Sequence, residues 1–481
     1  MTLQSNPSLG SDGGPAGARV PTRRRGRYAL AVAMPAVVAA IAASVYAIVH
    51  PERMPAPVGE LVEDLTGANP HPVHLVLPAA APLSAVALLG QQLFNDPALS
   101  ASGRQSCASC HSPQHAYGPP NDLSVQIGGP HMNQAGYRPP PSLTYLYRQA
   151  GFSIGPDLSG DSDVAVNLND LASSVQGVQR ATKTAGVAAA APAMVPQGGL
   201  FWDGRADTLQ SQAMGPMLDP VEMANGSLEE VAAKLEKSPY AGTLRQLFGE
   251  NLFSSPQLAV AEAMFAIGRY QLEAPSFHAF SSKYDYWLQG RARLTHAELR
   301  GLRLFNDPEK ANCAGCHLSQ PTKDGLPPLF TDTQYEALGV PRNRALAANK
   351  DPAFHDLGIC GPFRTDLAKQ TQYCGMFLTP TLRNVATRHA FFHNGVYHDL
   401  KHVLDFYNLR STDPAKIYPT NAAGKVELYD DLPPAYRANV DVTDAPFDRK
   451  PGDAPAMTEE DIDDIIAFLK TLDDGYQPSS D

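Results

Sequence analysis

The chain contains the stretch CASCH at residues 107–111 and the stretch CAGCH at residues 313–317. In a Cys-x-x-Cys-His motif the two thiols add to the vinyl groups of a haem, and the histidine that follows binds the iron. Zinc binding by the cysteine pairs is the alternative, but both pairs carry the additional histidine. We therefore expect two covalently attached c-type haems, held by Cys107, Cys110, His111, Cys313, Cys316 and His317.

The residues in front of the two motifs are repeated as well. LFNDP occurs at 93–97 and again at 304–308, each time at the end of a stretch with helical spacing of apolar residues. A helix before the motif and another that closes the unit are typical of the cytochrome c fold. We therefore predict an all-α protein with two tandem cytochrome c-like domains and long loops. The helices concerned span 84–94, 258–272, 295–305 with Thr295 as N-cap, and the stretch after the cap Thr458 that carries Ile462, Ile465, Ile466, Leu469 and Leu472.

Composition and charge narrow the class of protein. The 481 residues are enough for two or three domains, and 43 prolines and 38 glycines suit long ordered loops. The net charge of −11 argues against binding to nucleic acid, whose phosphates require a basic surface. It suits a basic partner protein.

The N-terminal part carries a candidate membrane segment. Residues 28–49 have no charge, follow an arginine cluster at 23–27, and are long enough to cross a bilayer. The arginines would keep the N-terminus in the cytoplasm and export the rest to the periplasm, and a cleaved signal peptide is the alternative. The expected organisation is a cytoplasmic tail over 1–27, an anchor or signal segment over 28–49, a linker over 50–80, a first cytochrome c-like domain over 81–280 with an inserted loop at about 145–195, and a second such domain over 281–481.

Two cysteines lie outside the haem motifs, Cys360 and Cys374. Export to an oxidising compartment allows a disulfide between them. Two buried free thiols are the alternative interpretation of the same residues.

Two further groups of residues make the comparison more specific. They are FWDGR at 201–205 with Gln212, Pro216 and Glu222, and TPTLRNV at 379–385 with FHNG at 392–395. With these motifs the sequence, over roughly its residues 80–475, resembles the bacterial diheme cytochrome c peroxidase family, including its MauG-type enzymes.

The resemblance implies a role for each of these residues. Trp202 would relay electrons between the two haems, and Arg205 would contact a haem. Gln212 and Pro216 would line the peroxide side of that haem. Glu222 would move a proton during O–O cleavage, which a sheltered carboxyl with a raised pKa can do. Without the surrounding motif, a core aromatic would be the better interpretation of Trp202 and a solvated helix residue that of Glu222.

The sixth ligand of the second haem distinguishes two mechanisms. Members that take electrons from a donor cytochrome use a methionine there, and MauG-type enzymes use a tyrosine. The resemblance places this ligand at Tyr407, with Met376 as the competitor. A phenolate favours oxidised over ferrous iron, so Tyr407 would let the second haem hold oxidising equivalents.

Two features of the family find no obvious counterpart in this sequence. The histidine that caps the first haem in many members aligns near Gly129, and the neighbouring His131 reads as a solvent-facing loop residue. The family also binds calcium between its haems through an asparagine that follows an arginine, and here Arg138 is followed by Pro139. The carbonyl ligands of that calcium would fall at Arg388 and Ala390, where a side-chain change is tolerated.

The resulting prediction is a periplasmic, membrane-anchored enzyme that reacts with hydrogen peroxide at the first haem. MauG-like enzymes share two oxidising equivalents as a pair of ferryl haems and use them to oxidise a redox protein or a residue of a protein substrate. A cytochrome c peroxidase that removes peroxide with electrons from a small cytochrome is the first alternative. A diheme electron carrier is the second.

Overall fold

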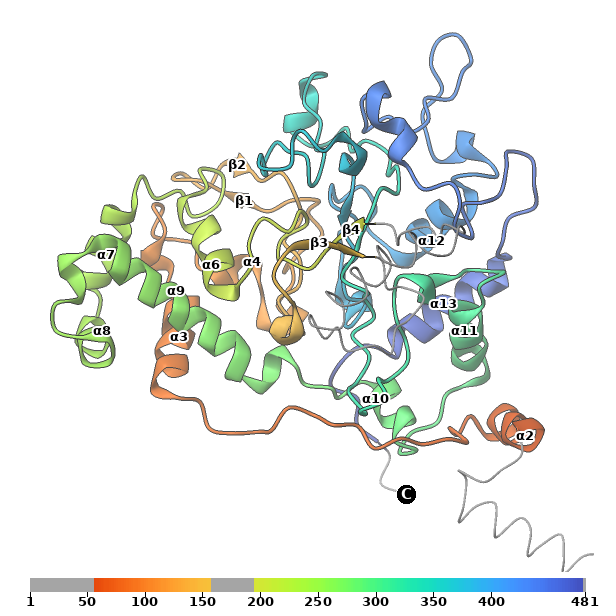
Figure 1. Ribbon diagram of the computed structural model, residues 1–481, viewed down its shortest axis with the longest axis horizontal. Coiled ribbons are helices and arrows are strands. Elements are labelled where there is room, and N and C mark those ends of the chain that lie inside the picture. Colours follow the sequence, from red (N-terminus) through yellow and green to blue (C-terminus); the bar gives the residue numbers. More distant parts are fainter. Residues whose placement is uncertain (1–55, 157–193, 479–481) are drawn as a thin grey trace, which may run out of the picture. The chain divides into compact units, whose positions relative to one another are not determined.

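The computed structural model describes residues 56–156 and 194–478, in which helices are joined by long loops (Figure 1). The predicted anchor at 28–49 lies outside these residues. Within the described part, no helix is long and apolar enough to cross a membrane.

The α-helices differ in length and mostly begin at a capping residue. They are α2 (Ala56–Thr66), α3 (Ala85–Asn95), α4 (Cys107–Cys110), α6 (Leu209–Leu218), α7 (Leu228–Lys237), α8 (Ala241–Phe248), α9 (Pro256–Glu273), α10 (Lys283–Leu288), α11 (His296–Asn306), α12 (Leu400–Leu409) and α13 (Glu459–Lys470).

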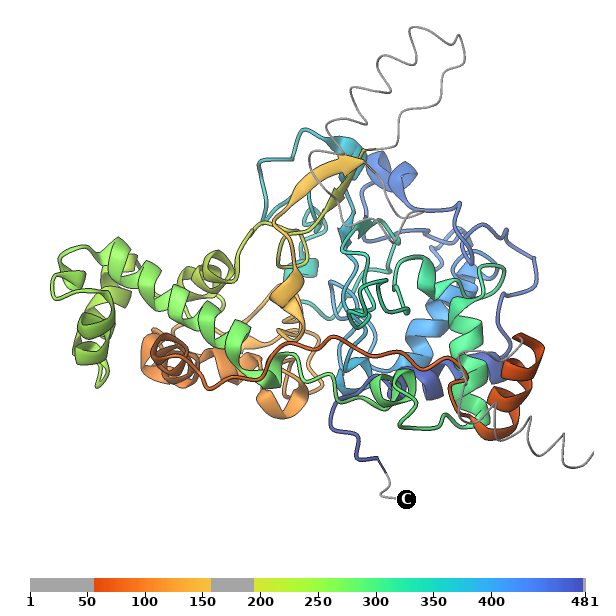
Figure 2. The same cartoon turned by 60° about the horizontal axis from the view of Figure 1, so that its bottom comes forward.

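The four helices predicted around the haem motifs are confirmed to within two residues at each end. Ser84 caps α3 through its side chain, and Thr295 caps α11 in a capping box with Glu298. Thr458 caps α13 in the same way with Asp461. In space α3 packs on α9 and α11 packs on α13, so the sequence repeat is also a structural repeat (Figures 1 and 2).

Each helix pair crosses at a glycine. A Cβ on Gly90 of α3 would lie 1.9 Å from the carbonyl oxygen of Ala266 on α9. A Cβ on Gly301 of α11 would lie 2.0 Å from the carbonyl oxygen of Asp464 on α13. Only a residue without a side chain allows the two backbones to approach so closely.

We expect Gly301→Ala to lower the free energy of unfolding by about 3 kcal/mol, because the new methyl group forces α11 and α13 apart. The matched control is Gly242→Ala inside α8, where an added Cβ meets no atom within 4 Å. That change should stabilise the protein by up to about 1 kcal/mol through helix propensity. Guanidinium unfolding followed by circular dichroism measures both, and equal effects would contradict the close crossing.

Two large hydrophobic cores accompany the two helix pairs. The first is built from α3, α7, α8 and α9 and the second from α10, α11, α12 and α13. Both belong to the single unit that begins at Glu60, and the domain boundary expected near residue 280 stays a prediction.

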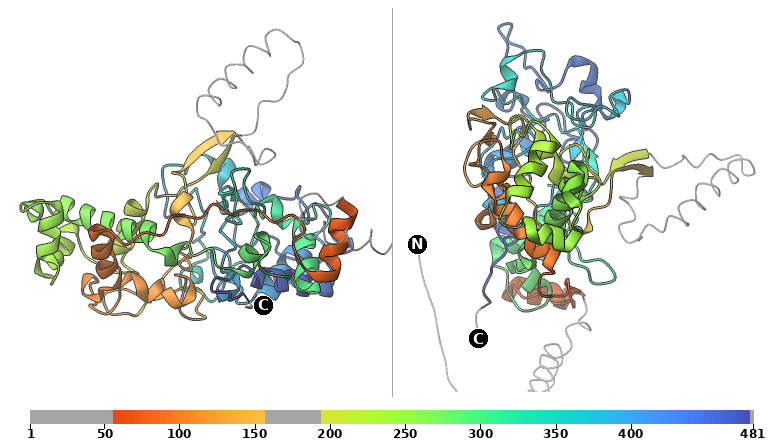
Figure 3. Two further views of the ribbon diagram at one scale, coloured as in Figure 1. Left: turned by 90° about the horizontal axis from the view of Figure 1, so that it is seen from below. Right: turned by 90° about the vertical axis from the view of Figure 1, so that its left-hand side faces the viewer.

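The all-α prediction is wrong, because the loops contain three antiparallel two-stranded sheets. Their strands have only two to four residues each, too few to produce a readable alternation of apolar and polar residues. The pair β3–β4 joins the two described ends of the predicted inserted loop (Figure 3). The strands are β1 (Ile127–Gly128) with β2 (Gln134–Ala135), β3 (Ser153–Pro156) with β4 (Met194–Gln197), and β5 (Tyr335–Glu336) with β6 (Phe377–Leu378).

Candidate functional site

The first haem motif forms the short helix α4 and the residue that ends it. Cys107 and Cys110 lie on α4, and His111 follows as its C-cap. The Nδ1 atom of His111 lies 3.1 Å from the carbonyl oxygen of Tyr117 and must donate to it, which leaves Nε2 available to iron. Burial lowers the pKa of His111 to about 4, so the imidazole is in the neutral form that binds metal.

The second motif repeats this arrangement. His317 donates from Nδ1 to the carbonyl oxygen of Phe330, at 2.9 Å, and burial likewise lowers its pKa to about 4. Tyr117 and Phe330 both adopt φ of +54°, an uncommon conformation for aromatic residues. The same backbone turn thus orients the histidine at both sites.

Each motif lines its own cavity, and both cavities fit a haem. Their walls are largely apolar, yet some buried polar atoms there have no partner within the described residues. These are Arg388 Nε in the second cavity and Gln105 Oε1 and Gln271 Oε1 in the first. Burial lowers the pKa of Arg388 to about 10. A haem propionate would supply an acceptor for the Nε atom that this buried guanidinium leaves unpaired.

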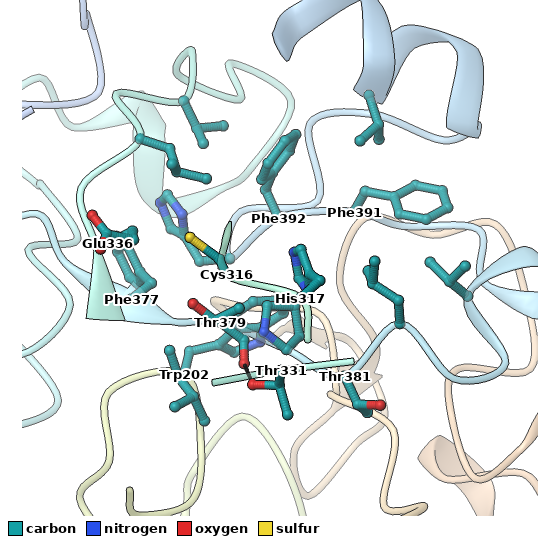
Figure 4. A pocket seen from close by; sticks show the side chains of 18 of the residues that line it. Trp202, Cys316, His317, Thr331, Glu336, Phe377, Thr379, Thr381, Phe391 and Phe392 are labelled. Atoms are coloured by element: carbon teal, nitrogen blue, oxygen red, sulfur yellow. Dashed lines mark hydrogen bonds between the residues drawn. The ribbon is translucent and has the colours of Figure 1, made fainter. Parts of the chain in front are cut away.

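Trp202 lies where the two cavities adjoin and lines both of them. Its indole Nε1 donates to the carbonyl oxygen of Pro139, at 2.9 Å. Figure 4 shows Trp202 at one edge of the second cavity, near Thr331 and Thr379. The indole is therefore placed between the two haem sites and held there by a specific hydrogen bond.

The residues expected on the peroxide side lie together in the first cavity. Gln212 and Pro216 project from α6, and Glu222 follows shortly after that helix. Burial raises the pKa of Glu222 to about 7; the negative charge of Asp219 adds to this, and Arg205 opposes it. Glu222 is thus a carboxyl that can both accept and release a proton near neutral pH.

A small hairpin holds the backbone of Glu222. Gly129, next to β1, donates its N–H to the carbonyl oxygen of Glu222, at 2.8 Å. A Cβ on Gly128 would lie 2.3 Å from the carbonyl oxygen of Val221, so a side chain does not fit there. His131 lies between the strands of this hairpin and is exposed, in agreement with a solvent-facing loop histidine.

Arg205 also lines the first cavity. Its Nη1 donates to both oxygens of Asp203, at 3.0 and 2.9 Å. Its guanidinium lies 3.7 Å above the ring of Phe201. The side chain is held at the edge of the site by these contacts.

The candidate sixth ligands of the second haem occupy different places. Tyr407 on α12 lines the second cavity and stacks on Phe447, with ring centroids 5.4 Å apart. Met376 forms a bridge with Gly358 and packs in a separate cluster. Among the described residues that line the cavity, Met376 is absent and Met457 is present. Met457 was missed in the sequence, because it precedes α13 without any motif around it.

The remaining cysteines form a disulfide, Cys360–Cys374. It closes a loop that carries Phe363, which reaches the wall of the first cavity. The cysteines of the two haem motifs are free thiols, as haem attachment requires.

Comparison with known proteins identifies the family. Residues 84–293 match the model of the family described as di-haem cytochrome c peroxidase. The chain is 32% identical over 428 residues to the methylamine utilization protein MauG of Paracoccus denitrificans, which covers 85% of this chain and 95% of that protein. This chain belongs to the diheme cytochrome c peroxidase family.

Other members of the diheme peroxidase family agree in sequence and fold. The cytochrome c peroxidase Ccp of Escherichia coli is 27% identical over 392 residues, covering 81% of this chain and 58% of that protein. The crystal structure of the diheme peroxidase BthA from Burkholderia thailandensis superposes with a TM-score of 0.69 at 37% identity, covering 84% of this chain and 89% of that chain. The protein is accordingly a peroxide-dependent oxidoreductase that carries two c-type haems.

Proposed function

We propose that this diheme peroxidase is a MauG-like enzyme of the periplasm. Peroxide would react at the haem of His111, and the second haem, held by His317 and Tyr407, would store part of the oxidising power. The observation that carries this proposal is the position of Tyr407, which lines the same cavity as Cys313 and Cys316.

The haems, when bound, supply the redox chemistry that reduces peroxide and holds the resulting oxidising equivalents. Glu222 accepts a proton from the oxygen that approaches the first haem and returns it to the departing oxygen, which leaves as water. Its pKa of about 7 suits both steps. The side-chain amide of Gln212, which has no hydrogen-bond partner among the described residues, is available to orient peroxide.

Trp202 would carry the electron that passes between the two sites. The carbonyl oxygen of Pro139 accepts the indole N–H bond, and this bond stabilises positive charge on an oxidised indole. The contact also fixes the ring, so that the gap to each haem stays constant.

A periplasmic location is supported by the chemistry of the cysteines. The disulfide Cys360–Cys374 requires an oxidising compartment. The electron donor would be a small redox protein or a residue of a protein substrate, and the net charge of −11 favours a basic surface on it.

The test is a reaction of the diferric protein with one equivalent of hydrogen peroxide, followed by Mössbauer and near-infrared spectroscopy. The proposal expects a rapid reaction that oxidises both iron centres beyond the ferric state. A reaction that starts only after half-reduction would instead identify a cytochrome c peroxidase. No reaction in either state would indicate an electron carrier.

The cytochrome c peroxidase alternative rests on Met457. This methionine lines the second cavity, and its backbone is fixed by Asn408, which accepts its N–H and donates to its carbonyl oxygen, both at 2.9 Å. A thioether ligand there would raise the potential of the second haem and favour electron uptake from a donor cytochrome.

A further inference from the structure

A buried arginine lies beside the junction of the two haem cavities. The Arg138 side chain is 8% exposed and forms ion pairs with two carboxylates, Asp203 and Asp356. Nη1 donates to Asp203 at 2.8 Å, while Nε and Nη2 form a bidentate pair with Asp356, each bond at 2.7 Å. Such a fork fixes the orientation of the guanidinium as well as its position.

Arg138 and its neighbour contact two consecutive residues of another segment. Arg138 binds the carboxylate of Asp203, and Pro139 accepts the indole N–H of Trp202. The two contacts together set the register between the segments. Asp203 is fully buried, and its carboxylate also accepts from Arg205 Nη1. Loss of Arg138 would leave only Arg205 to balance this buried charge directly next to Trp202.

The second carboxylate connects Arg138 to the disulfide region. Asp356 also accepts the N–H of Gly358, at 3.0 Å, just before the loop closed by the disulfide. The guanidinium lies 4.7 Å from the ring centroid of Phe363 and 5.6 Å from that of Phe377. Arg138 therefore joins three separate segments.

The same region does not fit the calcium ion that the family resemblance implied. The side-chain ligand position is Pro139, which has no side-chain oxygen, and its carbonyl oxygen accepts the indole N–H of Trp202. Within the described residues, no group of three or more His, Cys, Asp or Glu side chains is arranged to hold a metal. Calcium requires six to eight oxygen ligands. The nearby carboxylates of Asp203 and Asp356 are already paired with Arg138, which is positively charged as calcium is.

We propose that Arg138 positions Trp202 between the two haem sites, and that the residues of this region hold no calcium. Arg138 is a positioning residue, because it acts on Trp202 through Asp203 and Pro139. Its importance for turnover rests on the proposed relay role of Trp202, but its effect on the indole itself does not.

The test reads the indole of Trp202 in the resting holoenzyme. Trp287→Phe removes the second of the two tryptophans, so that ultraviolet resonance Raman bands of the indole N–H report Trp202 alone. In this background Arg138→Met should shift the N–H band toward that of a weaker hydrogen bond. Arg138→Lys, which keeps the charge but loses the fork, should give a smaller shift. An unchanged band in both variants would overturn the proposal.

Two further variants separate positioning from general destabilisation. Arg383→Lys breaks a bidentate pair with Asp285 in which both side chains are 0% exposed; it should lower the thermal midpoint and leave the Trp202 band in place. If Arg138 variants do not fold, Asp356→Asn decides, because it removes one carboxylate and should give a partial shift. A band shift in Arg383→Lys equal to that in the Arg138 variants would count against the proposal.

Calcium and kinetics complete the test. Removal of calcium with EGTA, and its readdition, should change neither the indole band nor the thermal midpoint, and a calcium-dependent change would overturn the proposal. In Arg138→Met, transfer of oxidising equivalents to the second haem should slow by about 10- to 100-fold, as expected for a misplaced group. A shifted band with unchanged transfer would support the positioning and overturn the relay role of Trp202 instead.

Discussion

Replacement of Glu222 by glutamine is expected to slow the reaction of the diferric protein with hydrogen peroxide by about 10²- to 10⁴-fold, the usual contribution of a general acid–base group. Glutamine keeps the size of the side chain but cannot take up the proton. Stopped-flow absorption of the haems measures the rate. Glu236→Gln is the control, because this carboxylate pairs with Arg245 at the surface and should leave the rate unchanged.

The pH profile of the same reaction separates proton transfer from simple steric damage. Because the pKa of Glu222 is about 7, the rate should rise as pH increases through 7 and level off above it, and Glu222→Gln should remove this step.

The raised pKa also means that the folded protein binds this proton more tightly than the unfolded chain. Its stabilising effect is present below the pKa of an unfolded glutamate, at about 4.3, and is lost as pH rises through 7. A rate of reaction with peroxide that does not change as pH rises through 7 would contradict the role assigned to Glu222.

Replacement of Trp202 by phenylalanine should leave the first haem reactive but slow oxidation of the second haem by at least about an order of magnitude. Phenylalanine keeps part of the packing and loses both the easily oxidised indole and the hydrogen bond to Pro139. Rapid-freeze Mössbauer spectroscopy after one equivalent of peroxide follows the two irons separately.

Trp287→Phe is the matched control for that experiment. Trp287 is buried and stacks on Tyr284. Like Trp202, it donates its indole N–H to a carbonyl oxygen, that of Gly67 at 3.0 Å. It lies in the second core and is not among the described residues that line the two cavities. Equal oxidation kinetics in Trp202→Phe and the native protein would rule out the relay.

The helices around the haem motifs could be predicted because their signals are local. Ser84, Thr295 and Thr458 precede regular apolar spacing, and each is an N-cap in the structure. The sheets could not be predicted, because their strands are short and, in two of the three sheets, pair across long stretches of loop. Tyr335 pairs with Leu378, for example, and no local pattern encodes that contact.

The candidate site likewise contains residues that could be predicted from the sequence and contacts that could not. The expected haem ligands His111 and His317 could be predicted from a motif. The turns that orient them depend on positive φ at Tyr117 and Phe330, and no sequence pattern indicates that conformation for an aromatic residue. The pairing of Arg138 with Asp356 joins residues that are 218 positions apart. Such contacts arise only from the assembled loops.

The central claim is that Tyr407 binds the second haem, and resonance Raman spectroscopy of the diferric protein tests it most directly. Protein grown with ring-deuterated tyrosine should show phenolate modes, enhanced by charge transfer to iron, that shift with the isotope. They should vanish in Tyr407→Phe and persist in Met457→Leu. A native spectrum without phenolate modes, together with a second-haem spectrum that changes only in Met457→Leu, would contradict the account.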